Sequence, residues 1–276
     1  MLTYQIFPPC EELKAHVSRY LITEVSDSNE LPFTTEVYPM NIPALNFQSR
    51  PGIYKYRDSN GAMNEAPVIN IVGQMICSGI TEFAQPGLIA TVIFTPTGLH
   101  KIFGVNMQLI TDKAVDAGVL IGKNELTECS RQIFEAPSIK AGLEELNRYL
   151  LKWSTTLGLD LRKMDKMASL INSRKGNVNI DWLSGQANMS AKTFERHFLE
   201  KIGITPKLFS RISRFSHSLK MLLEKSDLFS VLDECGYTDQ AHFIKECRRF
   251  CGKTPKFCIK DNEDLSRYFL SHFVKD

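Results

Sequence analysis

The C-terminal part of the chain contains two copies of one segment. Residues 183–207 read LSGQANMSAKTFERHFLEKIGITPK, and residues 232–256 read LDECGYTDQAHFIKECRRFCGKTPK. Aligned at an offset of 49 positions, the copies share a leucine at the start, a phenylalanine in the middle and a Gly-x-Thr-Pro-Lys ending. Helical periodicity alone would not place the two endings in register, so the repeat predicts one supersecondary unit used twice.

Each copy predicts a helix-turn-helix unit. In the first copy, an expected helix over 180–187 is followed by Asn188, which tolerates the left-handed conformation of a tight turn. Ser190 is a suitable N-cap for a second helix over 191–201. The second copy has the same elements in the same order, namely a helix over 229–235, Gly236 at the turn, Asp239 as the cap and a helix over 240–250. The second helix of such a unit can enter the major groove of DNA.

A single long helix is expected between the copies. It covers 206–224 and begins at Pro206, a residue type that suits the first helical turn. At about 1.5 Å per residue, this helix is roughly 28 Å long. Successive major-groove segments on one face of DNA lie about 34 Å apart. A rigid connector of this length can place two recognition helices in adjacent turns of one groove, so that one chain reads a continuous, asymmetric site.

Positive charge is concentrated in the same part of the chain. Residues 161–260 contain 19 Lys and Arg against 10 Asp and Glu, whereas residues 1–160 contain 12 against 17. A basic block inside a chain of net charge +2 points to a polyanionic partner for that block.

Residues 167–257 resemble the AraC/XylS-type transcription regulators. The motifs that carry the resemblance occur in order: Met-Ser-x-x-x-Phe-x-Arg-x-Phe at 189–198, Gly-Ile-Thr-Pro-Lys at 203–207, Arg214, Gly-Tyr-Thr-Asp-Gln at 236–240, Phe243 and Gly-Lys-Thr-Pro at 252–255. The resemblance implies an all-α domain of two helix-turn-helix units joined by a linker helix, bound to double-stranded DNA near promoters. It also implies RNA polymerase as a partner.

The resemblance assigns DNA contacts residue by residue. Base-reading positions fall on Lys192, Glu195 and Arg196 in the first copy and on Gln240, Ala241, His242 and Lys245 in the second. Phosphate contacts are expected from Ser190, Thr193, Thr238, Lys253 and Lys256. Because Ala241 offers no hydrogen bond, we expect the second helix to read thymine methyl groups or DNA shape more than base edges.

Three polar residues of this region have two interpretations. Glu195 can accept a hydrogen bond from cytosine or pair with neighbouring charges on its helix. His242 is either a DNA contact or a surface imidazole. Arg214 lies on the linker helix, where we expect it to pack and pair internally rather than to touch DNA.

The first part of the chain has the pattern of a β-rich domain. Up to residue 96, runs rich in Val, Ile, Phe, Tyr and Thr are separated by turn residues, which predicts strands over 19–25, 35–38, 44–49, 53–56, 68–75 and 88–94, after a short helix over 11–20. Helices are expected over 98–103, 139–153 and 161–173. The predicted fold class is therefore α+β, with a β-barrel domain and flanking helices at 1–158 and a double helix-turn-helix domain at 160–276.

Two short stretches resemble the sensor domains of a bacterial subgroup of the same family. They are FTPTGLHKIFGV at 94–105 and LITDK at 109–113. The resemblance implies a cupin-like barrel that binds a small-molecule effector, followed by helices that often mediate homodimers. It assigns no effector-contacting residue, so five aromatic residues stay open as either pocket lining or barrel core: Phe33, Tyr38, Phe47, Tyr54 and Phe94.

One set of residues suggests hydrolase chemistry, namely His100, Asp112, Asp116 and Glu135. No nucleophile elbow, phosphate loop or metal-ligand motif accompanies these residues. The sequence therefore predicts no enzyme and no cofactor.

A second set suggests a zinc site, namely Cys235, His242, Cys247, Cys251 and Cys258. Their spacing is irregular and contains no C-x₂-C pair. Free, mostly buried thiols are the favoured interpretation over a metal or redox sensor, and no metal is expected.

The sequence thus predicts a sequence-specific transcription regulator whose N-terminal domain senses a small molecule. The N-terminus lacks signal-peptide features and no run of about 18 apolar residues occurs, so we expect a cytoplasmic protein without a membrane partner. Two alternatives stay open. The N-terminal domain can serve only for dimerisation, or it can be an enzymatic or binding domain fused to the DNA-binding part.

Overall fold

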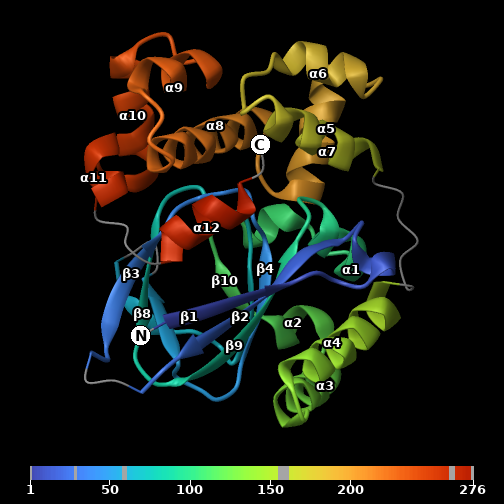
Figure 1. Cartoon of the computed structure of the whole chain (residues 1–276). Helices are drawn as coiled ribbons and strands as arrows, with labels where there is room; N and C mark the ends of the chain where they lie inside the picture. Colours follow the sequence, from blue (N-terminus) through green and yellow to red (C-terminus); the bar gives the residue numbers. More distant parts are fainter. Residues whose placement is uncertain (1, 28–29, 58–60, 155–161, 261–264, 275–276) are drawn as a thin grey trace.

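The computed structural model of the chain describes residues 2–27, 30–57, 61–154, 162–260 and 265–274. A β-rich N-terminal part lies against a layer of helices formed by the C-terminal part (Figure 1). The expected boundary between the two domains lies outside the described residues and stays a prediction. Below, residues up to 154 are called the sensor domain and residues from 162 the DNA-binding domain, after the roles that the sequence predicts for them.

The sensor domain contains two antiparallel sheets. The first has the strand order β1-β2-β9-β4-β7-β10, with β1 (Leu2–Phe7), β2 (Val17–Val25), β9 (Gly87–Phe94), β4 (Ala44–Gln48), β7 (Ile69–Val72) and β10 (Ala114–Asp116). The second has the order β3-β8-β5-β6, with β3 (Phe33–Val37), β8 (Gly79–Phe83), β5 (Tyr54–Arg57) and β6 (Met63–Glu65).

Strand β9 shows why its sequence is apolar almost throughout. Ala90, Val92 and Phe94 face the helices of the sensor domain and belong to one core cluster. The alternate residues Ile89, Thr91 and Ile93 line a cavity on the other side of the sheet. Both faces of the strand are therefore buried, as expected for a continuous apolar run.

Helices cover the outer face of the six-stranded sheet. They are η1 (Glu11–Leu13), α1 (Gly98–Phe103), η2 (Met107–Ile110), α2 (Ala117–Ile121), α3 (Lys123–Glu135) and α4 (Ile139–Ser154). Apolar residues of α3 and α4, such as Leu126, Leu146 and Trp153, join the same core cluster as the sheet.

The DNA-binding domain is all helical. Its helices are α5 (Arg162–Ser173), α6 (Ile180–Gln186), α7 (Ala191–Ile202), α8 (Pro206–Leu223), α9 (Leu228–Glu234), α10 (Gln240–Cys251), α11 (Pro255–Lys260) and α12 (Leu265–Phe273). None of the helices in the described part of the chain combines the length and apolar character that a bilayer crossing requires.

The predicted fold class is confirmed, but the expected helix over 11–20 is wrong. Only η1 is helical there, and β2 begins at Val17. The reason is pairing, because β2 lies between β1 and β9 and buries Val17 and Tyr20 in the core. The sequence analysis also missed β1, β6, β8, β10, α2, α3, α11 and α12. The strands β6 and β10 are only three residues long, and pairing with β5 and β7 defines them.

The cysteines differ from expectation at one place. A disulfide joins Cys251 to Cys258, because the turn after α10 brings α11 back against the end of that helix. The cysteines described as free are Cys10, Cys77, Cys129, Cys235 and Cys247.

The close approach of Gly98, the first residue of α1, to the turn before β2 predicts a strict requirement for glycine. A Cβ atom added at Gly98 would lie 1.9 Å from the backbone carbonyl oxygen of His16. We expect Gly98→Ala to lower the free energy of unfolding by about 2 kcal/mol or more, because backbone must move to relieve the overlap. Urea unfolding followed by circular dichroism measures this loss.

The matched control for that variant is Gly185→Ala, in helix α6. Its added Cβ would meet no atom within 4 Å, so the higher helix propensity of alanine should leave stability unchanged or raise it by up to about 1 kcal/mol. Equal urea midpoints for Gly98→Ala and the unmodified chain would contradict the close approach.

Candidate nucleic-acid interface

The first helix-turn-helix unit consists of α6 and α7. The turn between them places Asn188 at φ +52°, the left-handed conformation that the sequence predicts. The hydroxyl of Ser190 caps α7 by accepting a hydrogen bond from the backbone N–H of Thr193 at 3.3 Å. Gly203 ends the helix at φ +103°.

The second unit, α9 and α10, repeats this geometry. Gly236 occupies the turn at φ +67°, and the carboxylate of Asp239 accepts a hydrogen bond from the backbone N–H of His242 at 2.7 Å. Gly252 ends α10 at φ +69°. The prediction of one supersecondary unit used twice is confirmed.

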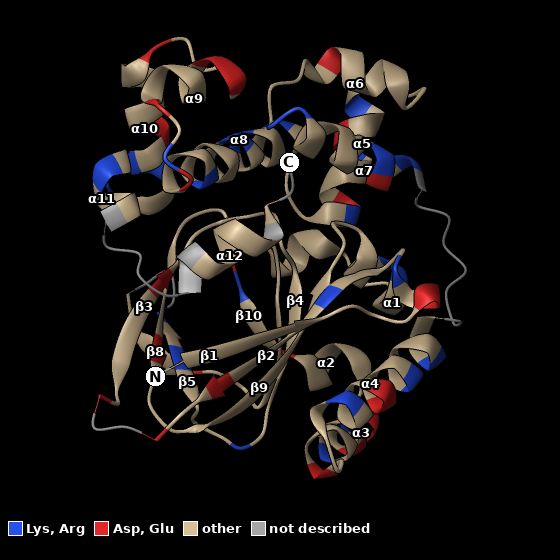
Figure 2. Cartoon of the chain, in the orientation of Figure 1, with Lys and Arg blue, Asp and Glu red and all other residues tan. Residues whose placement is uncertain are grey.

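Each second helix has a buried face and an exposed face. Phe194 and Phe198 in α7, like Phe243 and Cys247 in α10, are fully buried. This packing fixes the rotation of both helices and leaves most predicted base-reading residues exposed: Lys192, Glu195, Arg196, Gln240, Ala241 and Lys245. Figure 2 shows Lys and Arg on α7, α8, α10 and α11, whereas acidic residues mark α6 and α9.

The linker helix α8 packs against both units. The ring of Phe209 meets Phe198 of α7 edge-on at 5.4 Å, and the ring of Phe215 lies 5.2 Å from Phe250 of α10. These aromatic contacts attach α7 and α10 to the same helix, α8.

A buried ion pair adds to the attachment of α10. Arg211 of α8 bonds the carboxylate of Glu246 through two nitrogens, at 2.5 and 3.1 Å, and Glu246 is only 5% exposed. Such a two-pronged contact fixes orientation as well as distance. This pair was not predicted from the sequence. The signal for it was Glu246, an acidic residue on the inner face of the basic helix α10.

Two other cations of α8, Arg214 and Lys220, also point inward. Arg214 donates a hydrogen bond to the carbonyl oxygen of Gly176 at 3.3 Å and lies over the ring of Tyr237, which confirms its expected internal role. Lys220 donates to the carbonyl oxygen of Val274 at 3.0 Å. Arg211, Arg214 and Lys220 therefore hold the domain together, whereas Lys207 at the start of α8 is exposed.

His242 is half-buried and has partners within its own unit. Its Nδ1 lies 3.3 Å from the hydroxyl of Thr238, and its ring packs edge-on against Tyr237 at 5.3 Å. These contacts place His242 beside the exposed residues of α10 and orient its ring.

The predicted phosphate-contacting residues fall into two groups. Ser190, Thr193 and Thr238 lie at the N-terminal ends of α7 and α10, and Lys256 is exposed on α11. Lys253 differs, because its ammonium pairs with Glu36 of β3 in the sensor domain at 2.9 Å. The turn that follows α10 directs this lysine toward the sensor domain.

The sensor domain also lies against α7. The hydroxyl of Thr111 donates a hydrogen bond to the carbonyl oxygen of Gly203 at 2.6 Å, so η2 is held at the end of α7. A cavity of about 430 Å³ lies between the two, lined by Asn106 and Gln108 of the sensor domain and by Lys192, Glu195, Arg196, Leu199 and Glu200 of α7. All three predicted base-reading residues of α7 thus face sensor residues.

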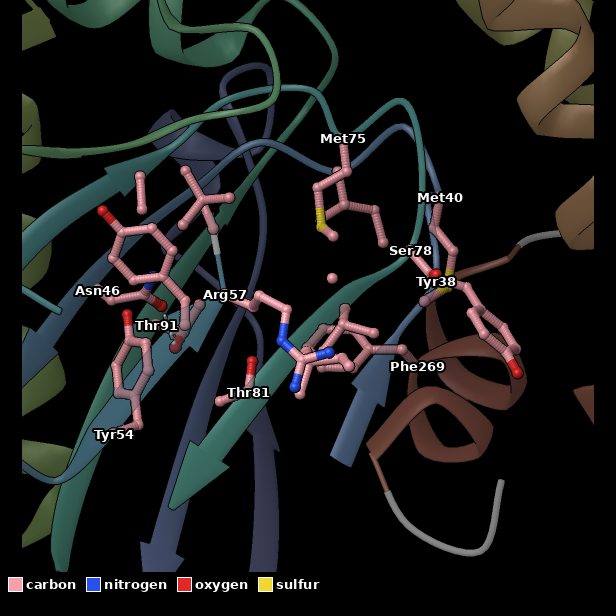
Figure 3. Close-up of a pocket in the computed structure, with 18 of the residues that line it drawn as sticks. Tyr38, Met40, Asn46, Tyr54, Arg57, Met75, Ser78, Thr81, Thr91 and Phe269 are labelled. Carbon is pink, nitrogen blue, oxygen red and sulfur yellow. Dashed lines mark hydrogen bonds between the residues drawn. The ribbon is translucent and has the colours of Figure 1, made fainter. Parts of the chain in front are cut away.

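A second cavity, of about 420 Å³, lies inside the sensor domain. Figure 3 shows residues that line it, among them Asn46 and Thr91 of the six-stranded sheet, Tyr54, Arg57 and Thr81 of the four-stranded sheet, and Phe269 of α12. Most of the lining is apolar, including Leu21, Ile42, Ile80 and Ile93. The cavity is roomy enough for a small organic molecule.

A hydrogen-bond network holds three of the polar residues that line this cavity, Asn46, Tyr54 and Thr91. The hydroxyl of Tyr54 and the amide of Asn46 both donate to the carbonyl oxygen of the Asn70 side chain, at 2.9 and 3.1 Å. Thr91 donates to Asn46 at 2.7 Å. Burial raises the pKa of Tyr54, so its hydroxyl stays a donor at neutral pH.

Two of the five candidate aromatic residues line the cavity. They are Tyr38 and Tyr54. Phe47 and Phe94 are core residues on the other side of the six-stranded sheet, and Phe33 packs on Phe83 at 5.4 Å.

The residues that suggested a hydrolase lie apart. His100 contacts the carbonyl oxygen of Val105 at 2.8 Å, Asp116 caps α2, and Glu135 pairs with Arg131. Asp112 accepts a hydrogen bond from the backbone N–H of Ile76 at 3.2 Å. Each has a local structural contact, and together they form no reaction centre.

The residues that suggested a zinc site are not arranged as metal ligands in the described part of the chain. Within the described part of the chain, no three His, Cys, Asp or Glu side chains are grouped so as to hold a metal ion. Burial raises the pKa of the Cys235 thiol to about 11 and that of Cys247 to about 12, so both are protonated at neutral pH.

Comparison with known proteins gives two family matches. Residues 183–260 match the model of a helix-turn-helix domain, and residues 5–116 match the model of a domain of unknown function, DUF6597. No curated protein matches the chain.

Several solved structures are similar over most of the chain. ToxT from Vibrio cholerae has 11% identity and a TM-score of 0.49, covering 95% of this chain and 99% of that one. ToxT from strain SCE256 with a bound unsaturated fatty acid has 10% identity and a TM-score of 0.47, covering 88% and 99%. The AraC-like transcriptional activator CuxR has 7% identity and a TM-score of 0.31, covering 76% and 84%.

The helix-turn-helix model spans α6 from Leu183 onward and the whole of α7, α8, α9, α10 and α11. Its range starts at Leu183, where the first copy of the repeat begins, and ends shortly after the second copy. Residues 183–260 of the chain therefore belong to a helix-turn-helix domain family.

Proposed function

We propose that the chain is a sequence-specific transcription regulator that reads two successive major-groove segments with α7 and α10. The observation that carries this proposal is the attachment of both units to one continuous helix. The 18 residues of α8 give a rod of roughly 27 Å, close to the separation of about 34 Å between groove segments.

Specificity is assigned to the exposed faces of the two recognition helices. Lys192, Glu195 and Arg196 read the first segment, and Arg196 is suited to a bidentate contact with guanine. In the second helix Gln240 and Lys245 offer hydrogen bonds, and Ala241 offers a methyl contact to thymine. His242 has its ring oriented by Thr238 and Tyr237, so it contributes from the edge of this face.

Affinity is assigned to phosphate contacts around these helices. Ser190, Thr193 and Thr238 lie at helix N-termini, where backbone N–H groups favour an anion. Lys256 is exposed and available. Lys253 contributes only when its ion pair with Glu36 opens.

The effector is proposed to be a small, mainly apolar molecule with one acidic group, bound in the sensor cavity. Arg57, the exposed last residue of β5, is among the residues that line this cavity (Figure 3). Among the described residues, no hydrogen-bond or ion-pair partner engages its guanidinium group, whereas the nearby Asp112 and Lys113 bond backbone groups. A domain that served only for dimerisation would have no use for such a cavity, so effector binding is favoured over that alternative.

Three further expectations stay predictions. They concern a homodimer, contact with RNA polymerase and action in the cytoplasm. The effector cavity and the DNA interface do not depend on them.

Replacing Arg196 tests the assigned reading face. We expect Arg196→Ala to weaken binding to the preferred DNA site by about 1–3 kcal/mol and to relax the preference at one base pair. Lys256→Ala should instead weaken all sequences alike and lower the slope of log affinity against log salt by about 0.9. Titration of duplex libraries at several salt concentrations measures both effects.

The control for both variants is Lys163→Ala, an exposed lysine on α5 outside the two units. It should leave affinity and preference unchanged. If Arg196→Ala behaved like this control, the docking face assigned to α7 would be wrong.

A proline in the linker helix tests the rigid spacing. Ser216 lies mid-helix, so Ser216→Pro removes a backbone hydrogen bond and overlaps the preceding turn, at about 3 kcal/mol or more. We expect specific affinity to fall toward the non-specific level while salt-sensitive binding survives. In footprinting, the unmodified chain should protect two adjacent groove segments of the DNA, whereas Ser216→Pro should protect only one.

Ser216→Ala is the matched control, because the Ser216 hydroxyl bonds only the carbonyl oxygen of Ser213 in its own helix. This variant should bind nearly as the unmodified chain does. Wild-type affinity and two protected segments in Ser216→Pro would rule out a rigid spacer.

A further inference from the structure

The two recognition helices present different side chains on equivalent faces. The cavity between α7 and the sensor domain marks this face on α7, because the residues of the helix that line it are Lys192, Glu195, Arg196, Leu199 and Glu200. At the repeat offset of 49 positions, the equivalent residues of α10 are Ala241, Ile244, Lys245, Arg248 and Arg249. The face of α10 therefore begins with two apolar residues and ends with three cations.

The ends of the two helices show that these positions correspond in the structure. Both helices have 12 residues, and a glycine ends each of them. The N–H group of Gly203 donates to the carbonyl oxygen of Leu199 at 3.0 Å, and the N–H group of Gly252 donates to that of Arg248, also at 3.0 Å. Arg248 therefore holds in α10 the place that Leu199 holds in α7, and the residue after each corresponds as well.

The exposed surfaces of the two helices differ in charge. The exposed charged residues of α7 are two cations and two anions whose charges cancel, namely Lys192, Arg196, Glu195 and Glu200. Those of α10 are three cations with a net charge of +3, namely Lys245, Arg248 and Arg249. The acidic residue of α10, Glu246, is buried and paired with Arg211. The end of α10 is therefore suited to an anion in a way that the end of α7 is not.

Neither arginine is engaged elsewhere in the described part of the chain. Arg248 and Arg249 are exposed and form no ion pair or side-chain hydrogen bond with other described residues. Both lie in the last turn of α10, where a cation also interacts favourably with the helix dipole. Helix α7 forms with the anion Glu200 at the equivalent place, so the dipole does not require an arginine there.

The length of α10 places these arginines beside the DNA backbone. A recognition helix contacts base edges with its N-terminal residues. Arg249 follows Gln240 by nine positions, which at about 1.5 Å per residue is a rise of roughly 14 Å. The major groove is about 12 Å wide. When the start of α10 lies on base edges, its last turn therefore lies at the edge of the groove, next to phosphates.

The start of the same face is apolar. Ala241 is exposed, and Ile244 is half-buried but does not pack on the core of the DNA-binding domain within the described residues. In α7 the place of Ile244 is taken by Glu195. Two neighbouring apolar side chains fit the methyl group of thymine and offer no hydrogen bond to a base edge. Gln240 and Lys245 flank them and are the hydrogen-bonding groups of this part of the helix.

We propose that the second unit holds DNA by contacts that the first unit does not make. Arg248 and Arg249 bind phosphates at the edge of the second groove segment, and Ile244 joins Ala241 in contacting thymine methyl groups within it. This inference rests on the proposed function, because it needs α10 in a major groove. It makes the end of α10 a main source of affinity and α7 the main source of hydrogen-bonded base reading.

DNA that lacks single methyl groups tests the thymine contact. The full chain is titrated with its selected duplex, in which deoxyuridine replaces the thymines of one protected segment at a time. The base pair at which Arg196→Ala relaxes the preference marks the first segment. We expect each contacted thymine of the second segment to lose roughly fourfold in affinity, the value of one buried methyl group. The same replacement in the first segment should change affinity less than about twofold.

Two substitutions at Ile244 assign the methyl contact to this side chain. In Ile244→Ala, deoxyuridine at one thymine of the second segment should cost less than about twofold instead of fourfold. Ile244→Val keeps a branched apolar side chain and should retain most of the loss. Circular dichroism verifies that each variant is folded.

The salt dependence of binding tests the two arginines. Arg248→Ala and Arg249→Ala should each lower the slope of log affinity against log salt by about 0.9 and weaken all duplex sequences alike. Glu200→Arg, which places an arginine at the equivalent position of α7, should raise this slope by about 0.9 or more. Lys163→Ala on α5 is the control and should leave the slope unchanged. Arginines that served only the helix dipole would change the thermal midpoint and not the slope.

The outcomes separate this inference from the proposed function. If the unmodified chain preferred no duplex sequence, the proposed function would fail and this inference with it. The proposed function would stand, and this inference would be overturned, in either of two cases. In the first, a preferred duplex has no thymine in its second segment, or deoxyuridine there leaves affinity unchanged. In the second, Arg248→Ala and Arg249→Ala keep the salt slope of the unmodified chain.

Discussion

The structure depends on the burial of one helix, α8, on nearly all sides. Its bulky residues Phe209, Ile212 and Phe215 are fully buried. The same helix buries four serines, Ser210 and Ser213 between these residues and Ser216 and Ser218 after them. Three of these hydroxyls donate to carbonyl oxygens three or four residues earlier in the same helix, so they need no outside partner. Because the serines are small and their hydroxyls are hydrogen-bonded, neighbouring helices can approach α8 closely. The aromatic residues of α8 supply the apolar contact with them.

Charged side chains of the DNA-binding domain are also divided between its interior and its surface. Arg211, Arg214 and Lys220 of α8 make contacts inside the domain, where Arg211 pairs with Glu246. Exposed cations lie on α7, α10 and α11 and at Lys207, at the start of α8. A second partly buried pair joins Lys101 of α1 to Asp165 of α5, and the hydroxyl of Thr97 bonds the same carboxylate. Removing one partner of such a pair leaves a buried charge without compensation, which costs far more than an exposed pair contributes. The two domains are therefore joined by specific polar contacts as well as by apolar packing.

Much of the DNA-binding domain could be predicted from the sequence, because the repeat sets its elements independently of tertiary contacts. Asn188, Gly203, Gly236 and Gly252 all have the positive φ that their places in the two copies require. What the sequence did not reveal comes from contacts between distant segments. The pairing of Lys253 with Glu36 spans 217 positions, and no local pattern marks it.

The same reason limits prediction in the sensor domain. A list of aromatic residues could not separate Tyr38 and Tyr54, which line the cavity, from Phe47 and Phe94 on the other side of the sheet. A shift of one residue in strand register exchanges the two faces, and register is set by pairing between strands. Phe269 lies outside both the repeat and the β-rich region, so nothing local to it indicates a cavity wall.

The central claim is that one rigid chain reads two groove segments at a fixed separation. The most direct test is the affinity of the unmodified chain for its selected DNA site after five base pairs are inserted between the two protected segments. The insertion turns one segment by about half a turn of the duplex relative to the other. If α8 is a rigid spacer, the affinity for this DNA falls to the non-specific level, commonly about 10³-fold or more below the specific affinity. Affinity within a factor of about two of the original would contradict it, because two units that adapt to any spacing are not held by a rigid α8.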